Sequence, residues 1–377
     1  MSRITRFAVP GVALFAGLVC STSSLKAALT VHEWGTFTSV HASDGRVLSG
    51  LEREEERLPN FVKSHAGFAP ADKGWSRPVR NVTIKMETPV LYFYADTETP
   101  VRVDVGFNGG SIGQWYPERS GGETVAPPGP RVAVTDFAKG FEGSVRWQAT
   151  VLAKGDPATV TAPKEWETPQ WPRARVAGAN RVRTADGSVE GFLFYRGMGN
   201  FGLPVKIFTN EAGRLTVENT GREVIPYLLV YRMESGVPGS RELRDLAPGE
   251  RREVPVLTAA LMGIHGELVA AGLTGEEAKA MLATWRESYF ERDGLRVFWI
   301  MPRGFTDEIL PLSISPAPEK LERVLVGRSE VLTPAFEREL VAEFKQDGGR
   351  RRVNDRYFLA YAERARQLGV VMPAKTP

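Results

Sequence analysis

Apolar and polar residues alternate along much of this chain, which predicts β-strands. After Pro100 the side chains of Val101, Val103, Val105 and Phe107 alternate with polar ones. Similar runs occur at 145–151 and 224–232, and residues that favour turns separate them. Short strands spaced by turns are typical of a β-sandwich.

The segment 31–40, with the sequence VHEWGTFTSV, is the first predicted strand after the N-terminal leader. Successive side chains of a strand point to opposite faces. One face would carry His32, Trp34 and Thr36, and the other Glu33, Gly35 and Phe37. A buried polar group needs a hydrogen-bond partner, so one face should hold such a partner or open to a ligand.

Helical spacing of apolar residues is confined to the C-terminal third. Leu257, Leu261, Ile264 and Leu268 are spaced as one buried helix face requires. The segment 274–277, with the sequence TGEE, predicts a capping box at the start of a second helix. Further helices are predicted after the Thr-Pro pair at 333–334 and over 356–368, with strands at 295–301 and 310–315 between them.

These patterns predict an α+β fold that is mainly β, with two β-sandwich-like layers or domains followed by an α/β C-terminal region. The predicted segments are a leader at 1–27 and an N-terminal β-rich domain at 28–175, which contains a long loop at 41–80. A second sandwich-like domain is predicted at 176–256, and a C-terminal helical and α/β region at 257–377 packs on the β domains.

The first residues are typical of a signal peptide. Arg3 and Arg6 precede an apolar run that is too short to span a bilayer, and cleavage is expected between Ser21 and Ala28. Val19 stands where a lipoprotein signal needs a small residue, which argues against lipid attachment at Cys20. Cys20 is the only cysteine, so the mature chain is free of disulfides. Together these features predict a bacterial periplasmic or extracellular protein.

The charge balance bears on whether nucleic acid is a partner. The chain has 48 basic and 45 acidic residues, and removal of the leader takes away Arg3, Arg6 and Lys26 but no acidic residue, which leaves 45 − 45 = 0. Nothing in this balance favours nucleic acid. No transmembrane segment is expected after signal removal. Composition indicates neither the oligomeric state nor the ligand.

Four motifs resemble those of a group of exported bacterial proteins that has no assigned function. They are HEWGTFT at 32–38, ETPVLYFY at 87–94, FLFYRG at 192–197 and RVLVGR at 323–328. The resemblance extends over nearly the whole mature chain. It implies export but brings no catalytic residue with it.

Three histidines could form a metal site. His32, His41 and His65 fall early in the mature chain, with Glu33 and Asp44 nearby in sequence. Imidazoles with a carboxylate suit zinc in a site that keeps an open position. Their spacing matches no compact metal motif, so the main expectation is that the protein has no cofactor, with zinc as the alternative.

Catalysis would depend on His32 and Glu33. A hydrolase, with or without a metal, could divide acid and base roles between Glu33 and a second carboxylate such as Asp44 or Glu52. No nucleophile elbow or other catalytic motif accompanies these residues. They therefore remain candidates by residue type alone.

Ligand binding is the leading hypothesis. The stretch 195–202 is rich in glycine and carries Arg196 and Asn200, although a tight turn also explains it. Trp34 and Trp115 are candidate aromatic contacts for a carbohydrate or peptide, while other tryptophans in irregular segments (Trp75, Trp166 and Trp171) offer further platforms. The chain is thus predicted to be an envelope-associated ligand-binding protein. The alternatives are a secreted hydrolase and a structural envelope protein with no pocket.

Overall fold

The computed structural model describes residues 28–53, 58–65, 78–125, 134–161, 170–176, 178–255, 257–259 and 263–371. The predicted leader at 1–27 lies outside the described residues, as do Trp75, Trp166, Leu261 and parts of the predicted loop at 41–80.

The strands in chain order are β1 (Leu29–His41), β2 (Lys63–Ser64), β3 (Val79–Arg80), β4 (Ile84–Ala95), β5 (Thr99–Asn108), β6 (Gly110–Tyr116), β7 (Gly121–Gly122), β8 (Thr135–Asp136), β9 (Glu142–Val151), β10 (Val182–Thr184), β11 (Val189–Glu190), β12 (Leu193–Gly199), β13 (Val205–Thr209), β14 (Leu215–Asn219), β15 (Ile225–Glu234), β16 (Val237–Leu246), β17 (Arg251–Glu253), β18 (Thr258–Ala259), β19 (Gly294–Ile300), β20 (Leu312–Ser315) and β21 (Lys320–Val331). The α-helices are α1 (Gln170–Arg173), α2 (Ile264–Ala270), α3 (Gly275–Trp285), α4 (Arg303–Ile309), α5 (Pro334–Asp347) and α6 (Phe358–Gln367). Short helical segments are η1 (Phe137–Lys139), η2 (Arg286–Phe290), which is a π-helix, and η3 (Arg350–Arg352).

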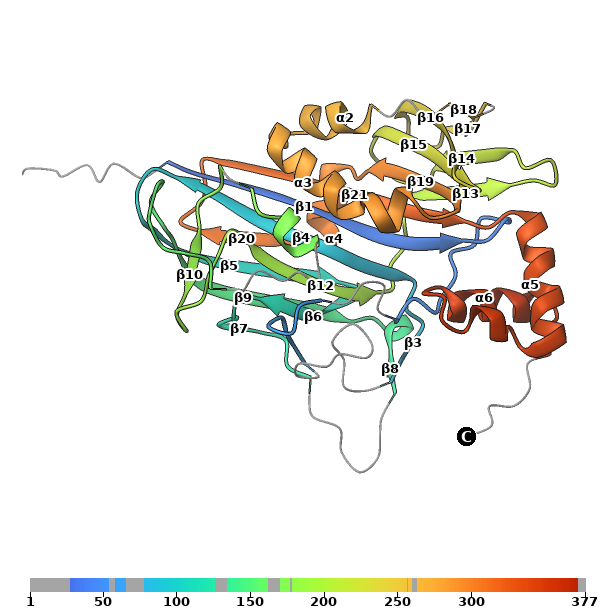
Figure 1. Cartoon of the computed structure of the whole chain (residues 1–377), viewed down its shortest axis with the longest axis horizontal. Coiled ribbons are helices and arrows are strands. Elements are labelled where there is room, and N and C mark those ends of the chain that lie inside the picture. The colour runs from blue at the N-terminus through green and yellow to red at the C-terminus, as the bar shows by residue number, and fades with distance from the viewer. Residues whose placement is uncertain are drawn as a thin grey trace, which may run out of the picture.

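Strand β1 lies in the middle of a sheet of 16 strands formed by the described residues. It pairs antiparallel with β4 and parallel with β21, a strand nearly 300 residues further along the chain. The path through the sheet is β11-β10-β9-β6-β12-β4-β1-β21-β19-β15-β16-β18 (Figure 1). The chain is therefore α+β and mainly β, as predicted.

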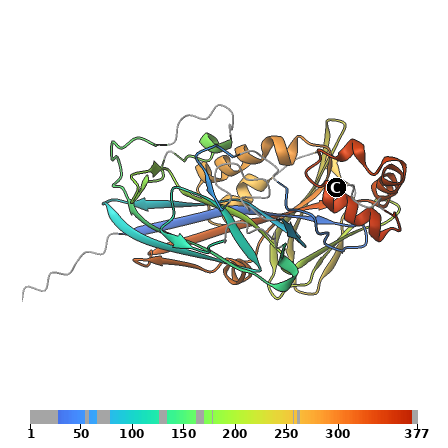
Figure 2. The ribbon, with the colours of Figure 1, turned by 90° about the horizontal axis from the view of Figure 1, so that it is seen from below.

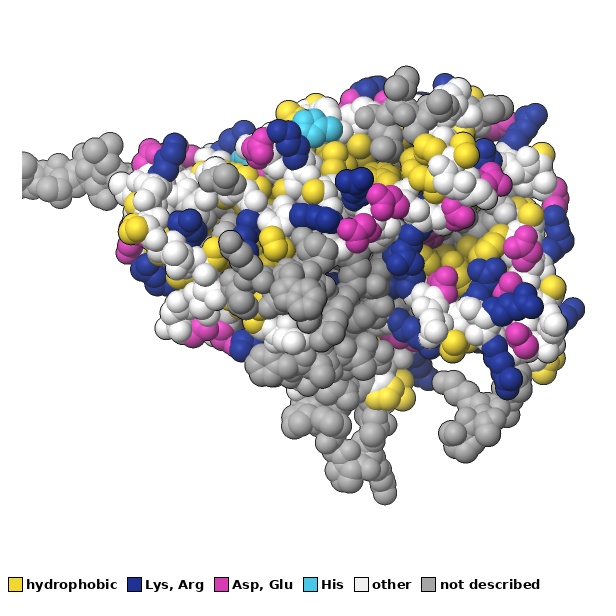
Figure 3. Space-filling view, viewed as in Figure 1, with side chains coloured by type: hydrophobic (Ala, Val, Ile, Leu, Met, Phe, Trp, Pro, Cys, Tyr) yellow, Lys and Arg dark blue, Asp and Glu magenta, His cyan; other side chains and the backbone are white. Residues whose placement is uncertain are grey.

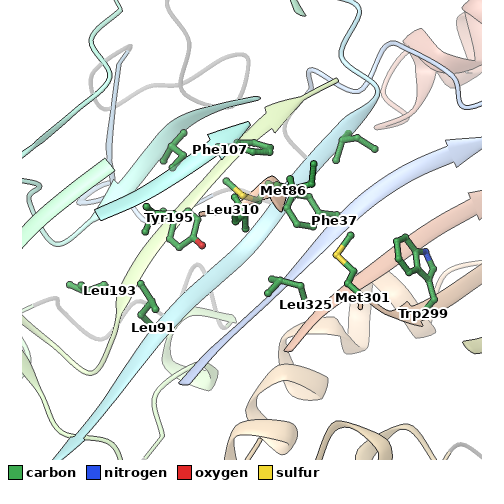
Figure 4. Packing of buried hydrophobic residues seen from close by; sticks show 14 of the residues in the cluster. Phe37, Met86, Leu91, Phe107, Leu193, Tyr195, Trp299, Met301, Leu310 and Leu325 are labelled. Atoms are coloured by element: carbon green, nitrogen blue, oxygen red, sulfur yellow. The ribbon is translucent and has the colours of Figure 1, made fainter. Parts of the chain in front are cut away.

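A second β layer covers one face of β1. Strand β5 pairs with both β9 and β20, and the small sheet β13-β14-β17 packs on the same apolar core, with β13 next to β1 and β21. Val103 of β5 and Trp147 of β9 belong to the same buried cluster as Phe37 of β1 and Leu325 of β21. Figure 4 shows Phe37 and Leu325 within this cluster. This is the apolar interior of the predicted sandwich, built from the alternating positions of each strand.

Helices α1, α2 and α3 cover the opposite face of β1. Trp34 of β1 and Trp285 of α3 share a second buried cluster there. The predicted capping box is present, because the Thr274 hydroxyl accepts from the backbone of Glu277 and the Glu277 carboxylate accepts from the backbone of Thr274. It fixes the first turn of α3, which belongs to the group of orange helices on one face of the sheet in Figure 2.

Helices α5 and α6 pack at one end of the sheet, shown in red in Figure 1. Thr333 caps α5 before Pro334, and Gly348 ends it at φ +69°, as the sequence predicts. Leu340 and Phe344 of α5 form a third buried cluster with Val40 of β1. One strand therefore contributes to all three cores.

The structure differs from the sequence-based prediction in two places. The helix predicted from Leu257 to Leu268 begins only at Ile264, because Thr258 pairs instead with Ser240 of β16. Tertiary strand pairing here outweighs the local helical spacing. Strands from all three predicted segments of the mature chain also join the one large sheet, since β4, β12 and β21 lie close together in it.

The described helices include none with the length and apolar character needed to cross a lipid bilayer.

Candidate functional site

His32 and Glu33 lie on opposite faces of β1, as their alternation predicts. His32 faces helix α3 and is 5% exposed, while Glu33 faces the second β layer and is 0% exposed. Because the sheet separates them, they do not line a common cleft. The structure therefore does not assemble the predicted catalytic pair of His32 and Glu33.

The carboxylate of Glu33 is fully engaged inside the sandwich. Its Oε1 accepts a hydrogen bond from the Tyr195 hydroxyl, and its Oε2 lies 2.6 Å from Nε of Arg323, which donates to it. Arg323 also donates to Asp307 at 2.7 Å. Burial works to lower the pKa of Arg323, but the negative charge of Glu33 raises it overall and keeps the guanidinium charged. Glu33 thus braces β1 against β12 and β21.

His32 is held by helix α3. Its Nδ1 donates to the Glu277 carboxylate at 2.9 Å, and the Tyr94 hydroxyl donates to the same carboxylate at 2.7 Å. Burial acts to raise the pKa of Glu277, but these two donors and the Thr274 backbone together hold it below its usual value. His32 Nε2 is buried and has no hydrogen-bond partner among the described residues.

The three histidines of the predicted metal site are far apart. His32 and His41 stand near opposite ends of β1, nine residues or about 30 Å of extended strand from each other. His41 bonds Ser39 at 3.1 Å, and burial lowers its pKa to about 4. His65 donates to the Ile112 carbonyl at 3.2 Å. Among the described residues no group of three potential ligands is placed to bind a metal ion, so the predicted zinc site of His32, His41 and His65 is not formed.

Three of the predicted ligand contacts are structural. Trp34 is fully buried beside Tyr92 in the core beneath α3. Trp115 is 5% exposed, packs on His65 and lies under the Arg119 guanidinium at 3.8 Å from the ring centroid. Asn200 donates to the Asn81 carbonyl and accepts from Thr83. None of them lines the pocket described next.

Arg196 is the predicted contact that does line a pocket. The stretch 195–202 is mostly strand rather than turn, because Tyr195 to Gly199 belong to β12. Gly197 is required there by close packing, since a Cβ atom would stand 1.8 Å from the Ser111 carbonyl oxygen. Alternation then places Phe194 and Arg196 on the α3 side of the sheet.

The pocket lies between β4, β12, α1 and the end of α3. Its cavity volume is about 40 Å³, and the space counted with its open mouth is about 460 Å³. Aromatic and aliphatic side chains form most of the wall, with Arg196 among the few polar groups. The lining residues used below are Thr88, Trp171, Ala174, Phe192, Phe194 and Arg196.

Arg196 is 1% exposed and is held in place by two neighbours. Its Nε donates to Gln114 at 2.7 Å, and its Nη1 lies 3.7 Å from the Glu87 carboxylate. Burial lowers its pKa to about 9, so the guanidinium remains charged at neutral pH. A buried cation costs free energy unless polar partners surround it. The position of the Arg196 guanidinium beside an apolar cavity therefore requires an explanation.

The wall next to Arg196 carries backbone strain. The pairing of β1 with β4 shifts between Trp34 and Thr36, which places a bulge at Thr88 and Pro89. Thr88 has a φ of +49°, a conformation that β-branched residues rarely adopt. Gly35 makes room for the bulge, because a Cβ there would come within 2.9 Å of the Pro89 backbone. Bulges and strained residues of this kind gather at functional sites.

Sequence reasoning found Arg196 but missed the rest of this pocket. Trp171 was one of several tryptophans in irregular segments, and nothing in the sequence placed it opposite Phe192 and Phe194, which it now contacts. Glu277 was identified as a capping residue, and its second role as the partner of His32 carries no local signal. The bulge residues Thr88 and Pro89 offered the one available hint, since proline inside a strand often marks an irregularity.

Comparisons with known proteins identify no family for this chain. The sequence matches no protein-family profile and no curated protein. Among solved structures, the chain is similar to the yeast delta-COP-I mu-homology domain, at 7% identity and a TM-score of 0.30, over 81% of this chain and 98% of that one. The same yeast domain in complex with a Dsl1 WxWxV peptide gives 8% identity and a TM-score of 0.29 over the same shares of the two chains.

Proposed function

We propose that this chain is an exported binding protein for a small ligand that joins an apolar body to an anionic group. The ligand would occupy the pocket of Trp171, Phe192 and Phe194, with its anionic group next to Arg196. Export is supported by the leader at 1–27, which is typical of a signal peptide.

The observation that carries the proposal is the position of Arg196 in the wall of an aromatic pocket. Small-molecule sites are usually apolar cavities in which a few fixed polar groups orient the ligand. Gln114 and Glu87 hold the Arg196 guanidinium in one place before any ligand arrives. A guanidinium carries five N–H donors and pairs well with carboxylates, so an aromatic or short-chain carboxylate fits this wall.

The alternatives gain less support. A hydrolase that uses His32 and Glu33 requires both in one cleft, whereas β1 presents them on opposite faces. A structural envelope protein would not need a strained bulge beside a cavity.

Figure 3 shows charged side chains of both signs interspersed over one face of the molecule, with hydrophobic side chains in small groups between them.

Calorimetric titration with benzoate tests the proposal, with benzyl alcohol lacking the anion and acetate lacking the ring. We expect saturable benzoate binding that is at least tenfold tighter than binding of either control compound. Ala174→Leu should weaken benzoate binding at least tenfold by filling the pocket. Ala174 lines the cavity, and its hydrogen bonds, with Tyr92, Gln170 and Trp171, are made by its backbone, so the fold should tolerate the change.

Ala271→Leu is the matched control. Ala271 packs against the same apolar cluster but does not line the pocket, so benzoate binding should be unchanged. Equal affinities of wild type and Ala174→Leu, or no saturable binding of benzoate to wild type, would overturn the proposal.

A further inference from the structure

A group of buried hydroxyls lies on the α3 side of the sheet, beyond the pocket. The side-chain oxygens of Thr36, Thr38, Ser288 and Tyr357 are shielded from solvent and have no hydrogen-bond partner among the described residues. Thr36 and Thr38 are both 0% exposed, and Tyr357 is 4% exposed. A buried hydroxyl without a partner costs free energy, so four such groups on the same side of the sheet require an explanation.

The two threonines stand in the middle of the sheet and have different neighbours. Thr36 is opposite Glu87 of β4 and Val326 of β21. Thr38 is directly opposite Lys85 of β4 on one side and Arg328 of β21 on the other. Laterally paired residues point to the same face, and their Cβ atoms lie about 5 Å apart. Lys85 and Arg328 are both 0% exposed. Two cations thus flank the hydroxyl of Thr38.

Ser288 and Tyr357 contact the two cations that flank Thr38. Ser288 belongs to the π-helix η2, and its carbonyl accepts hydrogen bonds from Arg328 at 3.5 Å and from Arg356 at 3.0 Å. The Tyr357 ring lies between two cations, with Lys85 Nζ 5.1 Å and the Arg356 guanidinium carbon 5.3 Å from its centroid. π-helical turns are frequent at functional sites.

The geometry points to a buried binding site for a small oxyanion, in which the hydroxyls of Thr36, Thr38, Ser288 and Tyr357 donate to its oxygens. We name these four residues the hydroxyl cluster. Phosphate, sulfate and a carboxylate share the required chemistry, namely several oxygens that accept hydrogen bonds and a negative charge. Hydroxyl donors together with neighbouring cations are the usual components of such sites.

The cations around these hydroxyls outnumber the carboxylates. Lys85 and Arg328 flank Thr38, and Arg356 lies beside Tyr357. Two carboxylates are also close by, but both lie beside arginines: Glu87, opposite Thr36, is 3.7 Å from Arg196, and Glu330 accepts from Arg296 at 2.7 Å and also from Arg328. The positive charge in excess favours an anion over a metal ion. These cations make other contacts as well, and the inference depends on the hydroxyls rather than on any unpaired cation.

Thermal unfolding of the mature protein in phosphate, sulfate, acetate and chloride at constant ionic strength tests the inference. In wild type we expect the midpoint to rise with the concentration of at least one oxyanion but not with chloride. Thr36→Val/Thr38→Val keeps the shape of both side chains but removes their hydroxyls, and it should raise the apparent Kd for that oxyanion at least tenfold. Tyr357→Phe removes a single hydroxyl and should raise the same apparent Kd by a smaller factor.

Thr306→Val is the matched control. Thr306 is also buried, and its hydroxyl has no partner within the described part of the chain, but it belongs to α4 next to the apolar cluster on the other side of β1. Its substitution should leave the oxyanion effect unchanged, as should Ala174→Leu in the benzoate pocket. Because Ala174→Leu blocks only the benzoate pocket, oxyanion binding and benzoate binding can be tested independently of each other.

Two results would overturn the inference. One is a wild-type midpoint that responds to phosphate, sulfate and acetate no more than to chloride. The other is an oxyanion effect that survives intact in both Thr36→Val/Thr38→Val and Tyr357→Phe. In that case ordered water fills the space among the hydroxyls, and removal of the hydroxyls would change stability equally in every salt.

Discussion

The imidazole Nδ1 of His32 lies 2.9 Å from the carboxylate of Glu277, although the two residues are 245 positions apart in the chain. This hydrogen bond joins the central strand β1 to the first turn of α3. The carboxylate that caps the helix therefore also fixes the helix to the sheet. The polar residue that opens the first strand has a bracing role.

Glu277→Gln should destabilise the protein by about 2–4 kcal/mol, because one buried carboxylate serves three donors and the amide presents a donor of its own to them. Those donors are His32, Tyr94 and the Thr274 backbone. Urea unfolding measures the loss. Glu276→Gln is the control, since Glu276 is exposed on the same turn and pairs only with Lys279 at the surface. It should change the free energy of unfolding by less than about 0.5 kcal/mol.

The stabilisation by Glu277 should also depend on pH. Its pKa is lowered in the folded state, so its contribution is present above the pKa of the unfolded chain, about 4.3, and is lost as the pH falls further. The difference between wild type and Glu277→Gln should therefore shrink below about pH 4. A difference that stays constant from pH 7 to pH 3 would contradict this role of the ionised carboxylate.

His41 should make the fold sensitive to mild acid. Burial lowers its pKa to about 4, whereas an unfolded histidine titrates near 6.5. Between these values the unfolded chain binds the proton and the folded protein does not, so stability falls as the pH drops from about 6.5 to about 4. The loss attributable to His41 is roughly 3 kcal/mol.

Urea unfolding of wild type and His41→Gln at several pH values measures this effect. Glutamine does not titrate, so the variant should lose less stability than wild type between pH 7 and pH 5. Parallel pH profiles of the two proteins would mean that His41 is already solvated or protonated in the folded state.

Glu33→Gln should cost about 3–5 kcal/mol, because it leaves the buried Arg323 without its charged partner inside the sandwich. Asp307→Asn removes the other carboxylate of the same arginine, and that side chain is 45% exposed. The second change should cost less than about 1 kcal/mol. Equal losses from the two substitutions, measured by chemical unfolding, would show that burial does not govern this network.

The sequence predicts local features well where one segment determines them. The alternation of β1 places His32 and Glu33 on opposite faces, and the caps at Thr274 and Thr333 are found as predicted. What it does not predict depends on pairing over long distances. Nothing near His32 indicates Glu277, and the parallel pairing of β1 with β21 joins segments near the two ends of the chain.

At the candidate site, too, the sequence does not predict contacts between segments that are far apart in the chain. Arg196 could be selected from its residue type and its glycine-rich surroundings, but the wall formed by Trp171 and Thr88 comes from separate segments. The hydroxyls of Thr36 and Thr38 belong to the motif that opens the chain's first strand, where they read as ordinary strand residues. Their lack of partners appears only when the neighbouring strands and η2 are in place.

Gly197 offers a further test of how tightly the sheet is packed beside Arg196. A Cβ atom at this position would stand 1.8 Å from the Ser111 carbonyl oxygen, which belongs to the backbone of β6 and cannot rotate away. Gly197→Ala should therefore destabilise the protein by about 3 kcal/mol or more, the upper range for an overpacked interior.

Gly266→Ala provides the comparison, because nothing lies within 4 Å of a Cβ placed there, in the middle of α2. Alanine favours helix over glycine by about 1 kcal/mol, so this variant should be as stable as wild type or more so. Urea unfolding of both variants measures the change in stability, and benzoate titration shows whether Arg196 has moved. If Gly197→Ala folds but loses benzoate affinity, the displaced β12 has moved Arg196, and unchanged affinity would show that the guanidinium is held independently of this contact.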